Sequence, residues 1–253
     1  MYTLLLRLAG PMQSWGTQSR FSIRDTGLEP SKSGVIGLVS AALGKPRVER
    51  PGDDEHWPTL AELAKLRIGV RVDHPGRMQY DYQTAGGVHR RGDRYGVAKA
   101  DGSTPQAVTS QRYYLADADF LVGMESEDRA LLTRLERALT GPVWPLYLGR
   151  KAFPPGEPVT FSGGLREQPL EESLRGHPWK PRSRREKEGV LKALMLNGGV
   201  GEPLRTLRLV LDAPYGSTPN VRCDVPLSFA ERRFMIRHVR IDQMVLTADL
   251  IRE

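Results

Sequence analysis

The side chains that could cut RNA are scattered along this chain. Metal-free cleavage needs a base, commonly His or Tyr, that activates a 2′-hydroxyl, and a cation that stabilises the developing charge. None of the five histidines is paired closely with a lysine; they are His56, His74, His89, His177 and His238. Tyr147 and Lys151 could supply a base and a cation, but no histidine accompanies them locally. The sequence does not exclude a distant partner, so metal-independent RNA cleavage stays open as an alternative.

Other catalytic chemistries have less support in the sequence. No CxxC or HxxxH spacing is present, and Asp117 and Asp119 lack further ligands for a metal ion. The glycine-rich run NGGVG at residues 197–201 lacks the Lys-Ser/Thr ending of a phosphate-binding loop. The single cysteine, Cys223, has no neighbouring triad motif and allows no intrachain disulfide. We therefore expect no metal and no other cofactor.

The charge of the chain favours a polyanionic partner. Lys and Arg number 37 against 30 Asp and Glu, a formal net charge of +7. Residues 77–112 mix cations with tyrosine and glycine, and residues 175–192 carry seven cations against two glutamates, with His177 and Trp179 interleaved. Two basic segments that bear aromatic residues suggest two contacts with nucleic acid. The second segment suits a solvated surface that meets target DNA or a neighbouring subunit.

The first long loop carries groups that suit a grip on RNA: phosphate donors, a flat ring and hydroxyls. These candidates are Gln13, Ser14, Trp15, Gln18, Ser19, Arg20 and Arg24. Three more stand at the expected start of a helix, whose free N–H groups favour phosphate: Ser31, Lys32 and Ser33. The alternative is structural. Trp15 would then pack in the core, the serines would cap the helix, and the arginines would be ordinary surface charges.

Two further groups of residues complete the candidate RNA-binding set. At the end of an expected strand stand Tyr147, Gly149, Arg150 and Lys151, which could equally form an exposed turn. Within residues 77–112, rings that can stack alternate with cations, although a plain charged loop is the alternative there. These residues are Tyr80, Tyr82, His89, Arg90, Arg91, Arg94 and Tyr95.

The elements that must position these side chains follow a simple order. Apolar alternation predicts strands at residues 2–9, 66–73, 112–124 and 144–149. Helical spacing and capping residues predict helices at about 31–44, 59–66 and 126–141. The order strand, helix, strand, strand, helix, strand is that of ferredoxin-like and RNA-recognition folds. The connection of about forty residues between the second and third strands is too long for a simple turn, so it predicts a projecting β-hairpin.

The last hundred residues read as a β-rich part. Three segments are strand-like: PVTFSGG at residues 158–164, LRTLRLVLDAP at 204–214 and HVRIDQMVLTADL at 238–250. No run approaches the roughly 18 uncharged apolar residues that a membrane helix needs. With a single cysteine and no signal peptide, the chain is expected to be soluble and cytoplasmic.

Four stretches together resemble one known family. They are LLLRLAGPMQSWGTQSRFSIRDTGLEPSKSGVIGLVSAALG at residues 4–44, DYQTAGG at 81–87, QRYYLADADFLVG at 111–123 and PLYLGRKAFPP at 145–155. In this order they resemble the CasD family of subunits of the type I-E CRISPR surveillance complex, Cascade. Each motif is weak alone, and the combination is specific. The resemblance runs over residues 4–155 and is less distinct beyond them.

The resemblance implies a repeat-associated RAMP protein that binds RNA without cutting it. Such a subunit holds the 5′ handle of the CRISPR RNA (crRNA) and caps the filament of backbone subunits. In that family the insertion forms a thumb that reaches over the guide and helps displace a base from pairing with target DNA, which places the thumb at about residues 77–112 here. The implied partners are the crRNA 5′ handle, the backbone subunit CasC, the large subunit CasA and, through the assembled complex, target DNA, with no membrane.

The sequence therefore predicts an α+β protein. Residues 1–155 would form a ferredoxin-like, RRM-like RAMP domain with an inserted β-hairpin thumb, and residues 156–253 a β-rich extension or small second domain. We expect a non-catalytic RNA-binding subunit. The alternatives are a metal-independent endoribonuclease that processes precursor crRNA, and a generic single-stranded RNA-binding protein without partner subunits.

Overall fold

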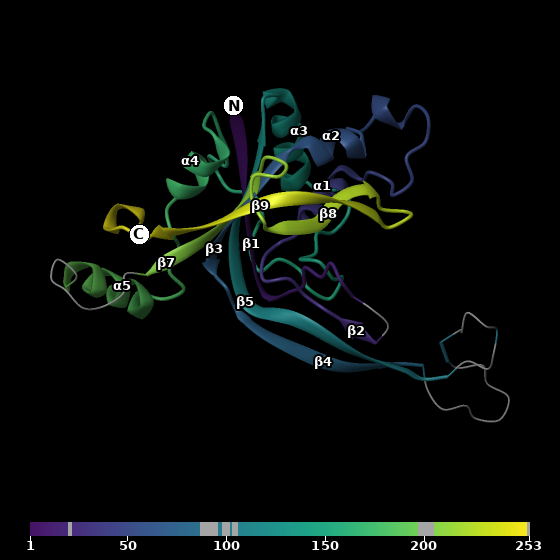
Figure 1. Ribbon diagram of the computed structural model, residues 1–253, viewed down its shortest axis with the longest axis horizontal. Helices are drawn as coiled ribbons and strands as arrows, with labels where there is room; N and C mark the ends of the chain where they lie inside the picture. Colours follow the sequence, from purple (N-terminus) through teal and green to yellow (C-terminus); the bar gives the residue numbers. More distant parts are fainter. Residues whose placement is uncertain (20–21, 87–95, 98–101, 103–105, 197–204, 252–253) are drawn as a thin grey trace.

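The computed structural model of the chain is organised around one large, mainly antiparallel sheet (Figure 1). It describes residues 1–253 except 20–21, 87–95, 98–101, 103–105, 197–204 and 252–253. The strands follow the order β6-β1-β5-β3-β7-β9-β8, and β2 and β4 each pair with β5 beside this path. The predicted α+β class is confirmed.

The first half of the chain builds the centre of the sheet. Strands β1 (Tyr2–Gln13) and β3 (Arg67–His74) flank the long strand β5 (Val108–Ser126). Helices α1 (Lys32–Leu43), α2 (Leu60–Lys65) and α3 (Arg129–Thr140) contribute to the core on one face of it. Each helix starts at a residue whose side chain accepts a hydrogen bond from the first turn: Ser31, Thr59 and Asp128.

The predicted fourth strand at residues 144–149 is wrong. The backbone N–H groups of Val143 and Trp144 donate to carbonyl groups in the last turn of α1, at 3.0 and 3.2 Å. They therefore satisfy the end of a helix rather than a strand ladder. The position beside β1 is taken by the short strand β6 (Leu165–Arg166). With β6 there, the order β6-β1-β5-β3 gives the predicted ferredoxin-like arrangement.

A ribbon projects from the sheet at the predicted insertion (Figure 1). Strand β4 (Arg77–Ala85) pairs with the first half of β5, and the short strand β2 (Ile23–Arg24) pairs with β5 from the other side. Gly76, at φ +70°, separates β3 from β4 and lies close to the backbone of Ala116. Side chains of β4 are exposed on both faces, so the ribbon leaves the core. The predicted β-hairpin is confirmed.

The last part of the chain continues the same sheet. Strand β7 (Thr206–Ala213) pairs with β3, β9 (Arg233–Val245) pairs with β7, and β8 (Val221–Ser228) lies at the end. Two of the three strand-like segments predicted here thus form strands. The third, at residues 158–164, forms no strand; it runs along the edge of β1, where Arg7 N donates to Val159 O at 2.9 Å.

Helices α4 (Leu170–Arg175) and α5 (Arg184–Leu196) contribute to a second apolar cluster, around Leu5, Leu121 and Trp179. Fully buried Arg71 anchors the chain between these helices, since its guanidinium group donates to Asp73 at 2.6 Å and to the carbonyls of Leu174 and Pro178. Two short 3-10 turns, η1 (Asp53–Glu55) and η2 (Ala248–Leu250), complete the elements. Within the described ranges, no helix is long and apolar enough to cross a membrane.

Candidate nucleic-acid interface

The loop that follows β1 is held at its base by buried polar groups. Gln13 is fully buried, and its amide nitrogen donates to Leu8 O and Ala118 O, both at 2.8 Å. Its amide oxygen accepts a 3.1 Å hydrogen bond from the indole of Trp15, which is 2% exposed. Ser14 is also buried, and its hydroxyl donates to Tyr113 O at 3.1 Å. The prediction of direct RNA contact by Gln13, Ser14 and Trp15 is therefore corrected: these residues shape the loop.

The start of α1 is likewise occupied from within the chain. Ser31 is buried and caps the helix, accepting a 3.2 Å hydrogen bond from Gly34 N. Lys32 is buried too: its ammonium group pairs with Asp212 at 3.1 Å, and its backbone N–H donates to Asp224 at 2.8 Å. A carboxylate thus already lies at the helix start, where we expected phosphate. Ser33 is only partly buried and lies beside the Ser31 hydroxyl.

Other predicted residues of the loop remain exposed. Asp25 shapes this part, because its carboxylate accepts hydrogen bonds from the Ser19 hydroxyl at 2.6 Å and from Gln18 N at 3.2 Å. The side chains of Gln18, Ser19 and Arg24 face solvent. Arg20 lies outside the described residues.

The turn at residues 147–151 is locked onto this loop. Ser14 N donates to Leu148 O at 3.0 Å. Gly149 has φ +94°, and a Cβ atom there would lie 1.8 Å from Ser14 O, so only glycine fits. Arg150 donates to the carbonyls of Arg24 and Asp25, at 3.0 and 3.4 Å. Two candidate clusters that lie more than a hundred residues apart in the sequence thus form one surface.

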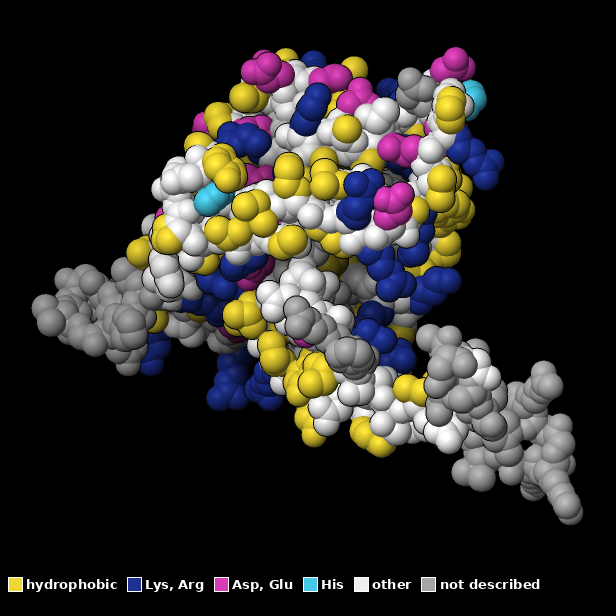
Figure 2. All heavy atoms as spheres, turned by 45° about the vertical axis from the view of Figure 1, so that its right-hand side comes forward, with side chains coloured by type: hydrophobic (Ala, Val, Ile, Leu, Met, Phe, Trp, Pro, Cys, Tyr) yellow, Lys and Arg dark blue, Asp and Glu magenta, His cyan; other side chains and the backbone are white. Residues whose placement is uncertain are grey.

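Positive charge is concentrated on this surface. Burial and the nearby guanidinium group of Arg112 lower the pKa of Arg150; the carboxylates of Asp25 and Asp81 oppose this shift, and Arg24 adds a smaller lowering. An arginine remains charged nonetheless, so several fixed cations stand together. Lys151 is exposed beside them and Tyr147 is half-buried. Figure 2 shows Lys and Arg side chains gathered on the side of the body that faces the ribbon.

The ribbon next to this surface presents aromatic rings. Tyr80 and Tyr82 are 55% and 66% exposed, and Tyr80 lies against Tyr113 with ring centroids 5.4 Å apart. Exposed rings on a strand can stack on unpaired bases. The remaining predicted thumb residues lie outside the described residues: His89, Arg90, Arg91, Arg94 and Tyr95.

The four described histidines each have partners away from Tyr147 and Lys151. His74 is buried and bonded to Lys180 O at 3.1 Å, and burial lowers its pKa. His177 accepts a 2.8 Å hydrogen bond from Arg166, His238 bonds to Thr218 O, and the ring of His56 packs edge-on against Trp57. In the described part of the chain, no three His, Cys, Asp or Glu side chains converge as metal ligands.

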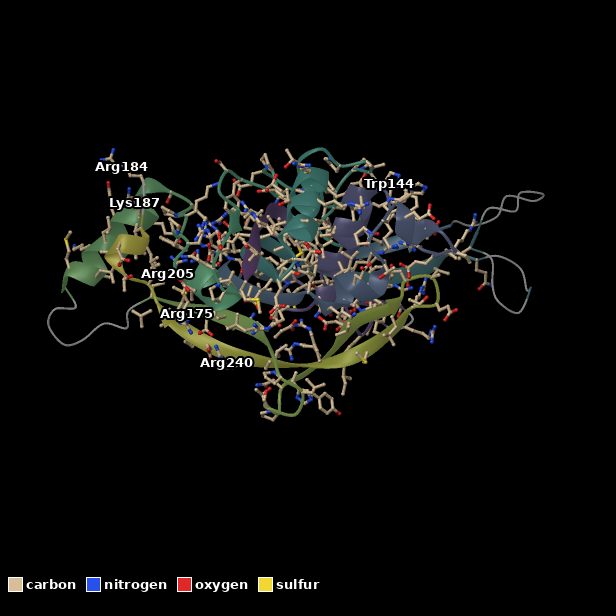
Figure 3. All side chains as sticks on the ribbon, turned by 90° about the horizontal axis from the view of Figure 1, so that it is seen from above. Trp144, Arg175, Arg184, Lys187, Arg205 and Arg240 are labelled. Carbon is tan, nitrogen blue, oxygen red and sulfur yellow. The ribbon has the colours of Figure 1, made fainter. Side chains whose placement is uncertain are left out.

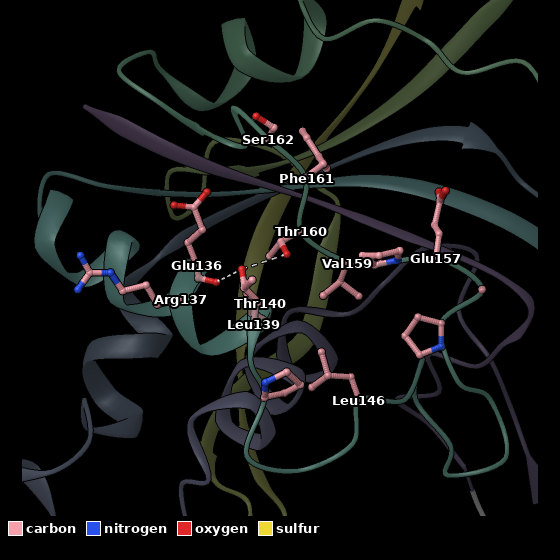
Figure 4. Close-up of a pocket in the computed structure, with 14 residues that line it drawn as sticks. Glu136, Arg137, Leu139, Thr140, Leu146, Glu157, Val159, Thr160, Phe161 and Ser162 are labelled. Carbon is pink, nitrogen blue, oxygen red and sulfur yellow. Dashed lines mark hydrogen bonds between the residues drawn. The ribbon is translucent and has the colours of Figure 1, made fainter.

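A large apolar groove lies elsewhere, at the carboxyl end of α3 (Figure 4). Its volume is about 1070 Å³, and Leu139, Leu146 and Val159 line it. The hydroxyl groups of Thr140 and Thr160 lie 3.3 Å apart and join its two walls. Among the described residues, none of those predicted to bind RNA lines the groove, so it is separate from the interface.

Comparison with known proteins identifies the family. The model of the CRISPR-associated protein family Cas5 matches residues 3–240. The chain belongs to the Cas5 family. The CRISPR system Cascade subunit CasD of Escherichia coli (strain K12) is 32% identical over 166 residues, which cover 62% of this chain and 68% of that protein. The resemblance inferred from the motifs is confirmed.

Two solved structures of this kind share the fold. One, described as the crystal structure of a Cas protein, is 39% identical with a TM-score of 0.67 and covers 99% of this chain and 98% of its own. The other belongs to a CRISPR RNA-guided surveillance complex; it is 33% identical with a TM-score of 0.73 and covers 98% and 92%.

Sequence reasoning missed two residues of this Cas5 surface. Asp25 orders the loop. Arg112 adds positive charge to the surface because β2 pairs in parallel with β5, which places Arg112 opposite Arg24. The basic character of residues 77–112 pointed to Arg112, but spacing gives no sign of a two-residue parallel strand.

Proposed function

We propose that this Cas5 protein is the subunit of a Cascade-type surveillance complex that holds the 5′ handle of crRNA and caps the filament of backbone subunits. The observation that carries the proposal is a single surface formed by the first loop, the turn at residues 147–151 and the root of the ribbon. The root is the end of the ribbon next to the sheet, where β2 pairs with β5. That surface combines exposed cations with nearby exposed tyrosines, the two kinds of group that hold a single strand.

The loop and turn supply the contacts to phosphate in this proposal. Arg24, Arg112, Arg150 and Lys151 provide the positive charge, and the side chain of Gln18 provides a neutral donor. Buried Gln13, Ser14 and Trp15 keep the backbone of the loop in place. Because these hydrogen bonds hold the loop backbone before RNA arrives, less backbone entropy is lost on binding.

The ribbon acts as the thumb in this proposal. Its exposed tyrosines would lie over the guide next to the handle, where an aromatic ring can replace a base in a stack. The partners are the backbone subunit CasC, the large subunit CasA and, in the assembled complex, target DNA. The subunit binds RNA without cleaving it, and it works in the cytoplasm.

The test is an RNA-binding assay carried out in EDTA. The purified full-length protein is incubated with labelled precursor crRNA, with mature crRNA and with mature crRNA lacking the 5′ handle, and binding and cleavage are scored together. We expect tight binding that depends on the handle, with every RNA left intact. Specific cleavage would instead assign a metal-independent endoribonuclease, and equal binding of all three RNAs would leave a generic RNA-binding protein.

A further inference from the structure

The outer face of α5 carries cations that the chain itself does not neutralise. Arg185 and Lys192 are exposed and lie two helical turns apart, so they share one face with Gly189 between them. Among the described residues neither cation forms an ion pair, and neither does Lys187; the only exposed pair on the helix is Arg184 with Glu188. Figure 3 shows α5, with Arg184 and Lys187 labelled, at one end of the molecule. This face therefore presents unpaired positive charge.

Gly189 is unusual at its position. Glycine within a helix costs about 1 kcal/mol relative to alanine. A Cβ atom at Gly189 would meet nothing within 4 Å. Packing within the described chain thus gives no reason for glycine here. A bare backbone between two exposed cations suits the close approach of another molecule.

The helix is fixed firmly enough to serve as a binding surface. Arg205 stacks on Trp179 with its guanidinium carbon 4.4 Å from the ring centroid, and it donates to Glu186 in the first turn of α5 at 2.7 Å. Partial burial opposes ionisation of Glu186, but hydrogen bonds from Arg205 and from Arg182 N lower its pKa, so the carboxylate remains charged at neutral pH. The start of α5 is thereby tied to the sheet.

The chemistry of this face favours the backbone of a duplex over an unstacked single strand. The sequence suggested stacking by Trp179 and His177, but Trp179 is 1% exposed and His177 is half-buried against Phe161. The described part of α5 contains no aromatic side chain. Cations without stacking platforms contact phosphates and read no bases.

The basic face also continues towards the root of the ribbon. A hollow of about 350 Å³ lies between the two, and its lining includes Arg77, Arg182 and Arg205 as well as Asp117 and Glu186. The side chains of Arg77 and Arg182 are exposed. Arg182 is anchored there because its guanidinium group donates to Asp117 O. A polyanion on α5 would therefore meet further cations as it approaches the ribbon.

We propose that the outer face of α5, centred on Arg185, Gly189 and Lys192, binds the phosphate backbone of double-stranded DNA at a site separate from the RNA surface. Binding of duplex by this face does not depend on the proposed function; that the duplex is the target of an assembled surveillance complex rests on the proposed function.

The test compares two charge-reversed variants of the full-length protein. Arg185→Glu/Lys192→Glu changes the proposed face, and Arg47→Glu/Lys65→Glu makes the same change in net charge at exposed positions before α2 and at its end. Affinity for a 30-base-pair duplex of arbitrary sequence and for handle RNA is measured by fluorescence anisotropy at several salt concentrations. We expect the α5 variant to lose roughly tenfold or more in duplex affinity and about 1.8 units of salt slope, with handle binding within twofold of wild type.

A second variant keeps the charge. Gly189→Leu introduces a better helix former and should raise the melting temperature, yet block close approach and weaken duplex binding several-fold. It decides the matter if the charge-reversed protein does not fold. The proposal is overturned if wild type does not bind duplex, if both charge variants lose duplex affinity equally, or if Gly189→Leu binds as wild type does. Loss of handle dependence with an intact α5 effect would contradict only the proposed function.

Discussion

At the scale of single residues, Gly149 shows how one small side chain joins two distant parts of the sequence. The sequence placed this glycine next to two cations, at the end of an expected strand or in an exposed turn. The structure gives the physical reason for a glycine: the backbone of Ser14 occupies the space that a side chain would need. The candidate interface therefore depends on a residue that has no side chain.

Gly149→Ala should destabilise the protein by at least about 2 kcal/mol, because it combines a left-handed backbone with a clash against Ser14 O. Thermal and urea unfolding measure this loss. Gly163→Ala is the matched control: Gly163 also has positive φ, at +74°, but has open space around it, so only about 1 kcal/mol of backbone strain is expected. Equal losses in the two variants would show that the contact with Ser14 contributes nothing.

Several residues with RNA-binding chemistry are structural for a reason that local sequence does not contain. The ammonium group of Lys32 pairs with Asp212, and its backbone N–H donates to Asp224. These carboxylates are about 180 and 190 residues away in the sequence. Gln13 and Trp15 satisfy each other and the neighbouring strands. Residue type predicted that these groups need hydrogen-bonding partners, but only the tertiary structure decides that the partners are protein groups.

At the scale of elements, periodicity predicted most of the framework. Strong apolar spacing explains why the predicted helices are present, together with the strands around residues 2–9, 66–73 and 112–124. The ribbon could be predicted from length alone. The fourth strand was wrong because residues 143–144 complete the end of α1, and its place is taken by a two-residue strand too short to leave a pattern.

The segment between α4 and α5 forms no helix or strand, and buried charged side chains hold it in place. Arg71 donates to two of its carbonyls, His177 O and Pro178 O, and to Leu174 O in α4, while Arg166 donates to the ring of His177 at 2.8 Å. Burial, followed by the charges of Arg71 and Arg166, lowers the pKa of His177 to about 3. The folded protein therefore holds this imidazole neutral.

Acid should weaken this part of the fold. Below the ordinary pKa of 6.5 the unfolded chain binds a proton at His177, whereas the folded chain does not until about pH 3. Neutral His177 therefore costs the folded state nothing above pH 6.5. As the pH falls below 6.5, the free energy of unfolding decreases, by up to about 2 kcal/mol at pH 5. His177→Gln, which accepts the same hydrogen bond without titrating, should show a smaller loss of unfolding free energy between pH 7.5 and pH 5.

The comparison isolates one group. Asp119, whose pKa burial raises to about 6, titrates in the same range with the opposite sign, but it is present in both proteins and cancels in the difference. Parallel pH dependence in wild type and variant would contradict a neutral, buried His177.

At the scale of the whole molecule, the sheet separates two basic surfaces. The first surface comprises the loop and the turn, together with Arg112 and Arg150. The second is the face of α5, which meets the start of β4 at the hollow lined by Arg77 and Arg182. The sequence showed two basic segments and predicted two contacts. It could not show that the first surface is assembled from residues 14–19, 22–25, 112 and 147–151, because that assembly depends on strand pairing and on one backbone contact across the fold.

The central claim is that this assembled surface holds the crRNA handle, and the salt dependence of handle binding tests it most directly. Arg24→Ala/Lys151→Ala removes two exposed cations from the surface, and Arg47→Ala/Lys65→Ala removes two from the region of α2. If Arg24 and Lys151 contact phosphates, the first variant should bind more weakly and reduce the slope of log affinity against log salt by about 1.4, while the second matches wild type. An unchanged slope in the first variant would contradict the account.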